Sequence, residues 1–340
     1  IYLARQKIDS YFCIMLCDEC YLSSNHSELK SFPYEQAIFT CAGLSVDDDN
    51  LIRKNYSIEH DGSLLQSVHE KPVSLTNDIM GSGTFICSPA IFECIEKAFV
   101  KNPDYVEFVS LLNELLYAGH KALYFQLTGT YVNINDRDSL ALAKYHDRDL
   151  QFEQCKKVLI IYAEGNENGI AFTIKRYVDI AVFHTIYVVI PHDSVLSEVV
   201  VQANAIPIVC PAGCILYGEK LRFAFAQCSA DIFVITEADY SFSSQDVVKL
   251  FSYLRDADMV IGTRTTRQLI EQGSTMRGLL RFAHASLGKM IELLWWNREA
   301  RFTDVGCTFR ALWSSTLDII SSDMHSTGPE FSAEMMIACL

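Results

Sequence analysis

Two carboxylates, Glu237 and Asp239, have the type and spacing best suited to chemistry in this sequence, because they directly follow an apolar, strand-forming run of five residues at 232–236. Side chains alternate between the two faces of a strand, so residues two apart can aim the same way from the end of a predicted strand. Open α/β sheets bind ligands at the carboxyl ends of their strands, and carboxylate oxygens are ligands that Mg²⁺ and Mn²⁺ prefer. The pair therefore predicts a metal site that holds a diphosphate, with a solvated acidic turn as the alternative.

Arginines are concentrated shortly after this pair, although the chain as a whole has a net charge of −14. They are Arg264, Arg267, Arg277 and Arg281, and they follow a predicted strand at 258–262. Arginine can bind a phosphate through two parallel hydrogen bonds. We therefore expect this segment to hold a phosphate of the substrate; a solvated loop is the alternative.

Four predicted strands lead up to the carboxylate pair and position it. Apolar runs lie at 158–162, 186–190, 206–210 and 232–236, and segments with helical apolar spacing separate them at 170–178, 195–203 and 219–228. Strands that alternate with helices are typical of a doubly wound, largely parallel sheet. The second half of the chain is therefore predicted to be an α/β domain whose ligand edge carries Glu237 and Asp239.

The first half of the chain predicts another α/β unit. One predicted strand ends at Asp18, others run over 36–41, 64–70, 80–89 and 123–132, and helices follow at 89–99 and 108–118. The charged stretch at 144–157 has no clear apolar period and no strand signal. We therefore expect two consecutive Rossmann-like domains, the first at 1–148 and the second at 157–340, joined by a linker at 149–156.

Composition argues against several classes of protein. Of the 340 residues, 50% are hydrophobic and 21% are charged, which is typical of a globular protein. The net charge of −14 argues against a nucleic-acid partner, and no segment reaches the ~18–20 clean apolar residues of a membrane span. The cysteines lie in apolar runs, which favours reduced thiols and a cytoplasmic protein. Cys13, Cys17 and Cys20 lack a paired CxxC motif, so zinc is not expected.

The predicted helix at 278–296 carries many large apolar side chains and ends in Trp295-Trp296. A helix of this kind usually packs in a core, and we expect it there. A peripheral contact with a membrane is the alternative, because paired tryptophans beside Arg298 and Arg301 also suit a membrane interface.

The segment from 158 to 340 resembles the family-two glycosyltransferases, in particular the dolichyl- and polyprenyl-phosphate sugar synthases. The resemblance rests on three ordered motifs, which are Thr236-Glu-Ala-Asp239, Met259-Val-Ile-Gly-Thr-Arg264 and Thr303-Asp-Val-Gly-Cys-Thr-Phe-Arg310. It implies a GT-A fold with a doubly wound mixed sheet. It also implies transfer of a sugar from a UDP-, GDP- or dTDP-linked nucleotide sugar to a lipid phosphate, at the inner face of the membrane.

This resemblance implies roles for particular residues. Glu237 and Asp239 would hold Mg²⁺ or Mn²⁺, with Asp239 central to catalysis. Arg264 would position the acceptor phosphate, with help from Arg267 or Arg277. A phosphate nucleophile is already ionised, so no strong general base is required.

Three further residues belong to the same implied site. Asp304 would order the site, while Glu164 and Asp193 would line the nucleotide pocket. Glu164 and Asp193 lie in altered versions of the family's two nucleotide-binding motifs, which leaves the base-binding part of the pocket less defined. Glu237 is also a departure, because the family has an aspartate there.

Residues 1–145 resemble the second half of the sugar-1-phosphate nucleotidyltransferases. The matching pieces are Leu16-Cys17-Asp18, Glu70-Lys71-Pro72, the glycines Gly81 and Gly83, and Asn133 or Asn135. The resemblance implies that Asp18 binds a metal and that Asn133 or Asn135 serves a second metal position. It also implies that Glu70 and Lys71 contact the sugar phosphate, near Gly83.

The two resemblances together imply a bifunctional enzyme of cell-envelope polysaccharide biosynthesis, which makes a nucleotide sugar and then transfers the sugar. The glycine-rich phosphate loop of the first family would lie before Ile1, and a closing motif of the second would lie beyond Leu340, so we expect both domains to be truncated. Two alternatives stay open. One is a nucleotidyltransferase with a catalytically silent second domain, and the other is a non-catalytic scaffold that binds nucleotide sugars.

Overall fold

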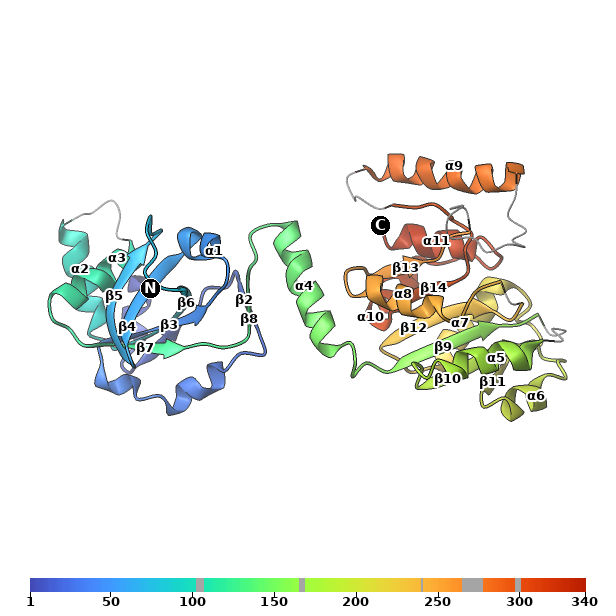
Figure 1. Cartoon of the computed structure of the whole chain (residues 1–340), viewed down its shortest axis with the longest axis horizontal. Coiled ribbons are helices and arrows are strands. Elements are labelled where there is room, and N and C mark those ends of the chain that lie inside the picture. Colours follow the sequence, from blue (N-terminus) through green and yellow to red (C-terminus); the bar gives the residue numbers. More distant parts are fainter. Residues whose placement is uncertain (102–106, 165–168, 240, 265–277, 297–300) are drawn as a thin grey trace. The chain divides into compact units, whose positions relative to one another are not determined.

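The computed structural model describes residues 1–101, 107–164, 169–239, 241–264, 278–296 and 301–340. The chain divides into two compact units, Ile1–Asp147 and Arg148–Leu340 (Figure 1). Each unit contains a six-stranded sheet together with helices, which confirms the predicted α/β class. Helix α4 (Arg137–Gln151) carries the chain from the first unit into the second.

The first unit is a mixed sheet with three helices of its own. Its strands are β1 (Phe12–Ile14), β2 (Glu19–Leu22), β3 (Phe39–Ser45), β4 (Tyr56–Asp61), β5 (Leu64–Glu70), β6 (Ile79–Cys87), β7 (Ala122–Gln126) and β8 (Thr130–Asn133), and its helices are α1 (Asp49–Lys54), α2 (Ile91–Lys101) and α3 (Phe108–Tyr117). The strand order in the sheet is β1-β6-β3-β7-β5-β4. Strand β4 also pairs with β6, so the strands from β6 to β4 form a closed ring of pairings.

The predicted strand that ends at Asp18 is divided in the structure. β1 pairs with β6, whereas β2 pairs antiparallel with β8 in a separate two-stranded sheet. The chain therefore changes partner between residues 14 and 19, and Asp18 lies in the turn just before β2. The apolar pattern alone could not reveal this change, because it does not show which strand each half pairs with.

The second unit is the doubly wound sheet that the alternating pattern predicted. Its elements are β9 (Lys157–Tyr162), α5 (Ile170–Asp179), β10 (Thr185–Ile190), α6 (Ser197–Gln202), β11 (Ile206–Val209), α7 (Tyr217–Gln227), β12 (Ile232–Glu237), α8 (Asp246–Leu254), β13 (Met259–Ile261), α9 (Gly278–Leu294), β14 (Arg310–Trp313), α10 (Ser314–Ile320) and α11 (Phe331–Ala338). The order is β11-β10-β9-β12-β14-β13, with β14 antiparallel to both neighbours. The strand order reverses between β9 and β12, which is where such sheets bind ligands.

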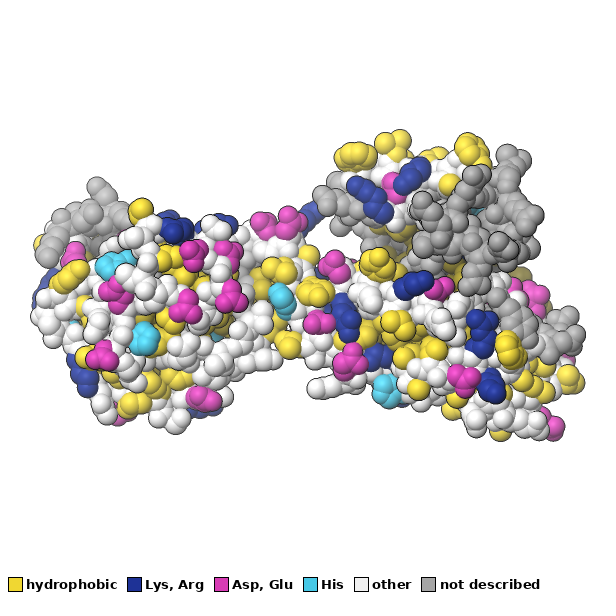
Figure 2. Space-filling model, in the orientation of Figure 1, with side chains coloured by type: hydrophobic (Ala, Val, Ile, Leu, Met, Phe, Trp, Pro, Cys, Tyr) yellow, Lys and Arg dark blue, Asp and Glu magenta, His cyan; other side chains and the backbone are white. Residues whose placement is uncertain are grey.

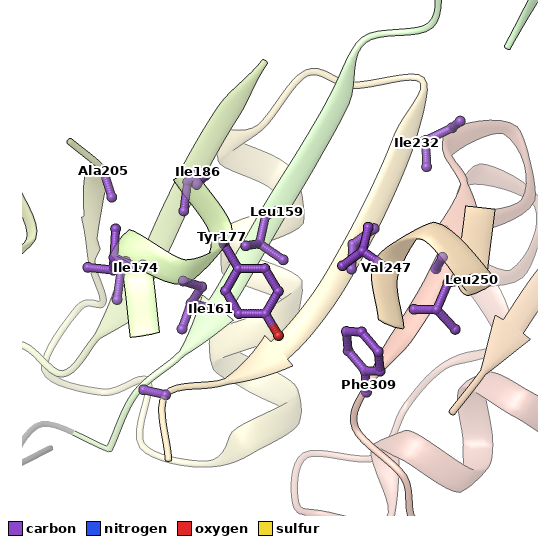
Figure 3. Packing of buried hydrophobic residues seen from close by; sticks show 14 of the residues in the cluster. Leu159, Ile161, Ile174, Tyr177, Ile186, Ala205, Ile232, Val247, Leu250 and Phe309 are labelled. Carbon is purple, nitrogen blue, oxygen red and sulfur yellow. The ribbon is translucent and has the colours of Figure 1, made fainter. Parts of the chain in front are cut away.

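Alternation along the strands of the second unit separates two cores. Leu159 and Ile161 of β9 face α5 and α8, where they pack with Ile174, Tyr177 and Val247 (Figure 3). Val158 and Ile160 face the other side and pack against α7, α10 and α11. Each such side chain, once buried, stabilises the fold by roughly 2 kcal/mol. By the same alternation, Tyr162 and Glu237 at the ends of β9 and β12 belong to the face that carries α7.

The segment expected as a linker, 149–156, is an ordered part of the second unit. Residues 149–151 complete α4, and the side chains of Phe152 and Cys155 are buried in the core beside α5 and α8. The Phe152 ring packs against Phe251 and Trp313. A charged helix end with two apolar residues after it has too weak a pattern to predict this burial.

Helix α9 meets the rest of the second unit along one narrow face, which corrects the expectation that it is a core helix. Ile291 is buried with Val305 and Met336, and a Cβ on Gly288 would come within 2.9 Å of the Phe302 carbonyl oxygen. Among the side chains of α9 that the structure describes, Phe282, Leu287, Met290, Leu293 and Leu294 are exposed, as is Trp296 just after the helix. Apolar residues almost all round the helix gave no indication of which side would be covered.

Candidate functional site

The predicted carboxylate pair lies at the carboxyl end of β12, next to the reversal of strand order. Glu237 is the last residue of β12 and lies opposite Tyr162, the last residue of β9. The chain continues through the buried Ala238, whose N–H donates to the Tyr162 carbonyl at 3.0 Å. Asp239 then lies exposed in a turn, where its carboxylate accepts hydrogen bonds from the Ser241 N–H at 3.0 Å and the Ser241 hydroxyl at 2.6 Å.

Glu237 is in an electrostatic environment that disfavours its charge. Burial raises the pKa of its carboxyl group, and the nearby Asp239 and Glu164 carboxylates raise it further. The Thr308 hydroxyl and the positive charge of Arg264 act in the opposite direction without reversing the shift. Burial and the neighbouring carboxylates therefore both disfavour the charge of Glu237, and a divalent cation bound there would favour it.

Arg264 is held by Asp304. Arg264 Nε donates to Asp304 Oδ2 at 2.8 Å, Nη2 donates to Oδ1 at 3.1 Å, and the Arg264 backbone N–H also donates to Oδ2 at 3.0 Å. The Asp304 side chain is fully buried, and that of Arg264 is 27% exposed. Burial acts to raise the pKa of Asp304, but these bonds and the Arg264 charge prevail, so the pKa lies below its usual value.

This pairing changes the role expected for Arg264. Two of its side-chain nitrogens bind Asp304, so the guanidinium is a fixed positive charge rather than a freely extended phosphate ligand. His284 of α9 lies on the same carboxylate, with Nδ1 3.4 Å from Asp304 Oδ1. A Cβ on Gly306 would come within 2.7 Å of the His284 ring, so glycine is needed for this close approach. Asp304 therefore joins the end of β13, α9 and the turn before β14.

Sequence patterns gave no indication of a buried arginine and a half-buried tyrosine beside this cluster. Arg310 is 1% exposed and donates hydrogen bonds to the carbonyl oxygens of Cys307, Val305 and Ser332. Tyr217 of α7 lies near Glu237, and burial, with a smaller contribution from that carboxylate, raises the pKa of Tyr217 to about 12. Only the packing of α7 and α11 onto the sheet brings these residues together.

The other residues predicted for the second unit lie around the same edge or outside the described residues. Glu164 follows β9, is exposed, and is near enough to Glu237 to raise its pKa. Asp193 lies exposed in the turn after β10, the strand next to β9. Arg267 and Arg277 lie outside the described residues.

The metal-binding residues predicted for the first unit come together through the pairing of β2 with β8. Ile134 N–H donates to the Asp18 carbonyl at 2.7 Å, and Asn135 Nδ2 donates to Asn133 Oδ1 at 2.5 Å. Asp18 and the two asparagines are therefore neighbours, as a shared site requires. Neither asparagine is favoured over the other by this geometry.

Glu70 and Lys71 lie at the end of β5, both exposed. Lys71 has a φ of 45°, a left-handed conformation that is uncommon for lysine. Its N–H donates to the Asn55 carbonyl at 2.7 Å, which holds the turn. Burial raises the pKa of Glu70, and Glu107 raises it further.

Glu19 is a prominent carboxylate of the first unit that the motifs did not include. It accepts hydrogen bonds from the Gly83 N–H at 2.9 and 3.0 Å, from the Tyr21 hydroxyl at 2.5 Å and from the Tyr131 hydroxyl at 3.0 Å. A Cβ on Gly83 would lie 2.5 Å from Leu16 and 2.6 Å from Glu19. The space beside Gly83 is therefore filled by side chains of this chain.

The donor set fits a divalent metal that is completed by a ligand. Across the described parts of the chain, no group of three or more His, Cys, Asp or Glu residues gathers around one point. Glu237 and Asp239 could supply two carboxylates, and the remaining positions of Mg²⁺ or Mn²⁺ would be filled by phosphate oxygens and water, as is usual for Mg²⁺. Such a site would form only together with its diphosphate.

Comparisons with known proteins give weak structural likenesses only. No protein-family model and no curated protein matches the sequence. A glucosyl-3-phosphoglycerate synthase from Mycobacterium tuberculosis matches with a TM-score of 0.41 and 13% identity, over 56% of this chain and 68% of that one. A UDP-glucose pyrophosphorylase in complex with UDP-glucose matches with a TM-score of 0.37 and 15% identity, over 45% of this chain and 60% of that one. Likenesses at this level carry no argument about activity, so the candidate site rests on strand order and on the residues at its edge.

Proposed function

We propose that the second unit is a metal-dependent glycosyltransferase that moves a sugar from a nucleotide sugar to a phosphorylated, polyprenyl-type lipid. The observation that supports this most is the position of Glu237 and Asp239. Glu237 ends β12 and Asp239 follows it at the reversal of strand order, and the Asp239 and Glu164 carboxylates place further negative charge near the half-buried Glu237. Edges of this kind bind nucleotides, and an acidic pair favours a divalent cation over an anion placed directly on it.

The residues at this edge of the sheet would have different roles in the reaction. A bound Mg²⁺ or Mn²⁺ would neutralise the charge of the leaving diphosphate. Asp239, oriented by Ser241, and the half-buried Glu237 would hold it. Arg264, fixed by Asp304 and acting on Glu237, supplies positive charge for the phosphate of the acceptor.

The exposed face of α9 favours a lipid acceptor. Phe282, Leu287, Met290, Leu293 and Leu294 of α9, with Trp296 just after it, are exposed. Figure 2 shows apolar side chains open to solvent over this helix. We propose that α9 lies on the cytoplasmic face of a membrane and brings the acceptor to Arg264, which shares Asp304 with His284 of α9. No helix among the described residues is long and apolar enough to cross a membrane, so a peripheral contact is the form proposed.

We also propose that the first unit is related to the sugar nucleotidyltransferases and supplies the nucleotide sugar. Asp18 lies beside Asn133 and Asn135, which supports a metal position there. The filling of the space at Gly83 by Leu16 and Glu19 counts against a sugar in that place. The transfer reaction is therefore the better supported half of the proposal.

Sugar transfer from labelled UDP-, GDP- and dTDP-sugars to polyprenyl phosphate in vesicles tests the proposal. The full chain should transfer label only with Mg²⁺ or Mn²⁺ present, and Asp239→Ala should lower the rate at least about a hundredfold, as expected for loss of a metal ligand. Asp318→Ala is the matched control, because Asp318 is an exposed carboxylate on α10. Equal activity in Asp239→Ala and Asp318→Ala would rule out the assigned site, and metal-dependent binding without transfer would favour the scaffold alternative.

A further inference from the structure

Lys220 is a buried cation near the proposed diphosphate site. It lies in the first turn of α7 and is 6% exposed. Its Nζ lies 5.5 Å from the centroid of the Tyr162 ring, and the Tyr217 ring packs against the same tyrosine with centroids 4.8 Å apart. Lysine is almost never this buried unless it is paired.

Within the described residues, the Lys220 Nζ has no hydrogen-bond acceptor and no carboxylate partner, and its contact is with the Tyr162 ring. The side chain is largely buried, while the Nζ itself keeps some contact with solvent. A cation–π contact offsets only part of the cost of partly desolvating an ammonium group. The position therefore has unused capacity to bind an anion. The other buried lysine of this unit, Lys157, differs in this respect, because its Nζ donates to the Phe152 carbonyl at 2.6 Å.

Lys220 faces the ligand edge of the sheet. α7 leads from the end of β11 back to the start of β12, so its first turn lies at the carboxyl ends of the strands. Tyr162, which Lys220 covers, ends β9 directly opposite Glu237 of β12. Cys210 directly follows β11. Burial raises the pKa of its thiol to about 11, while the positive charge of Lys220 acts to lower it. Lys220 therefore also lies near the carboxyl end of β11.

The first turn of α7 is held in place by close packing. A Cβ on Gly218 would come within 2.7 Å of the Ser326 carbonyl oxygen and 2.9 Å of Phe331. Arg222 of the same helix donates to the Met324 and Ser326 carbonyls at 3.3 and 2.8 Å. Lys220 is therefore presented from a fixed helix, and a fixed donor loses little entropy when a ligand binds.

We propose that Lys220 binds phosphoryl oxygens of the nucleotide diphosphate, on the α7 side of Tyr162, while Glu237 and Asp239 engage the same group through the metal. This inference rests on the proposed function, because it assumes a diphosphate at this edge. Lysine contributes a compact positive charge that suits a phosphate oxygen. With the ligand bound, the buried ammonium gains the anionic partner that it otherwise lacks.

Calorimetric binding of UDP and of inorganic pyrophosphate to the full chain, each with Mn²⁺, tests this role. Lys220→Met should weaken both ligands about tenfold to a hundredfold, the size of one charge-assisted hydrogen bond. Lys157→Met is the matched control, because it removes an equally buried lysine from the opposite end of β9. It should leave both affinities within about twofold of the wild type. Should Lys220→Met fold poorly, Lys220→Gln removes the charge while it keeps a hydrogen-bond donor.

The outcomes separate this inference from the proposed function. If the wild type binds both ligands and Lys220→Met binds them equally well, Lys220 is not a phosphate ligand and the proposed function stands. If Lys157→Met weakens binding as much as Lys220→Met does, the effect arises from lost buried charge in general, and the inference is also overturned. If the wild type binds neither ligand with Mn²⁺, the proposed function fails and the inference fails with it.

Discussion

The Arg264–Asp304 pair allows a sharp test of what organises the candidate site. Asp304→Asn keeps the shape of the side chain but removes its charge. Breaking a buried ion pair from one side typically costs ~3–5 kcal/mol, and the 27% exposure of the Arg264 side chain lowers the expected cost to about 2–3 kcal/mol. The asparagine carbonyl can still accept a hydrogen bond from the Arg264 backbone N–H. The interaction that is lost is therefore mainly the one with the Arg264 guanidinium.

Denaturant unfolding followed by tryptophan fluorescence measures this cost for the second unit alone. The three tryptophans, Trp295, Trp296 and Trp313, all belong to that unit. The control is Asp258→Asn, which removes an exposed partner of Arg148, with a side-chain exposure of 55% for Asp258. Exposed pairs contribute at most about 1 kcal/mol, so the control should change the free energy of unfolding far less.

The pH dependence of the same measurement has a definite sign. In the folded state the pKa of Asp304 lies below the ordinary value of 3.8 for an aspartate, so its charge stabilises the fold above about pH 3.8. That contribution is lost as the pH falls through the lower, folded pKa. The difference between wild type and Asp304→Asn should therefore shrink in acid. An Asp304→Asn cost at pH 7 no larger than that of Asp258→Asn would show that the pair does not hold the site together.

Two further predictions concern the edge of the sheet and α9. Because burial and Asp239 raise the pKa of Glu237, its ionised form destabilises the metal-free fold at pH 7. Glu237→Gln should therefore raise the thermal midpoint of the metal-free chain while it weakens Mn²⁺-dependent UDP binding; a lowered midpoint contradicts this reasoning. Trp296→Glu should reduce sedimentation with anionic vesicles about tenfold, whereas Tyr253→Glu, at an equally exposed aromatic residue on α8, should leave it unchanged. Equal losses in both variants would mean that α9 has no special part in membrane contact.

Local sequence patterns were sufficient to predict the strand and the turn that carry Glu237 and Asp239. β12 ends at Glu237 because an apolar run of strand-forming residues ends there, and the turn at Asp239 follows from the polar residues after it. The doubly wound order of the second unit follows from strands that alternate with helices, because a right-handed crossover leaves few ways to arrange them. These features depend on neighbours in the sequence, so the sequence alone predicts them.

Partners of buried charges were not predictable in the same way. Arg264 and Asp304 are 40 positions apart, and their pairing depends on the approach of β13 to the turn before β14. Lys220 reads as an ordinary charged helix residue, and only the packing of α7 against Tyr162 buries it. The spacing of apolar residues shows which face of a helix or strand is apolar. It does not show which other element covers that face, so it cannot predict these contacts.

The sequence by itself determined the α/β class, the strand that ends in Glu237 and the acidic turn at Asp239, because each is set by residues within a few positions of one another. The tertiary structure alone decided that Arg264 is tied to Asp304, that Phe282, Leu287, Met290, Leu293 and Leu294 of α9 face solvent, and that Lys220 lies largely buried beside the ligand edge. The physical reason is that burial and ion pairing are properties of surfaces in contact. Those contacts form between segments that are distant in the chain and leave no local pattern.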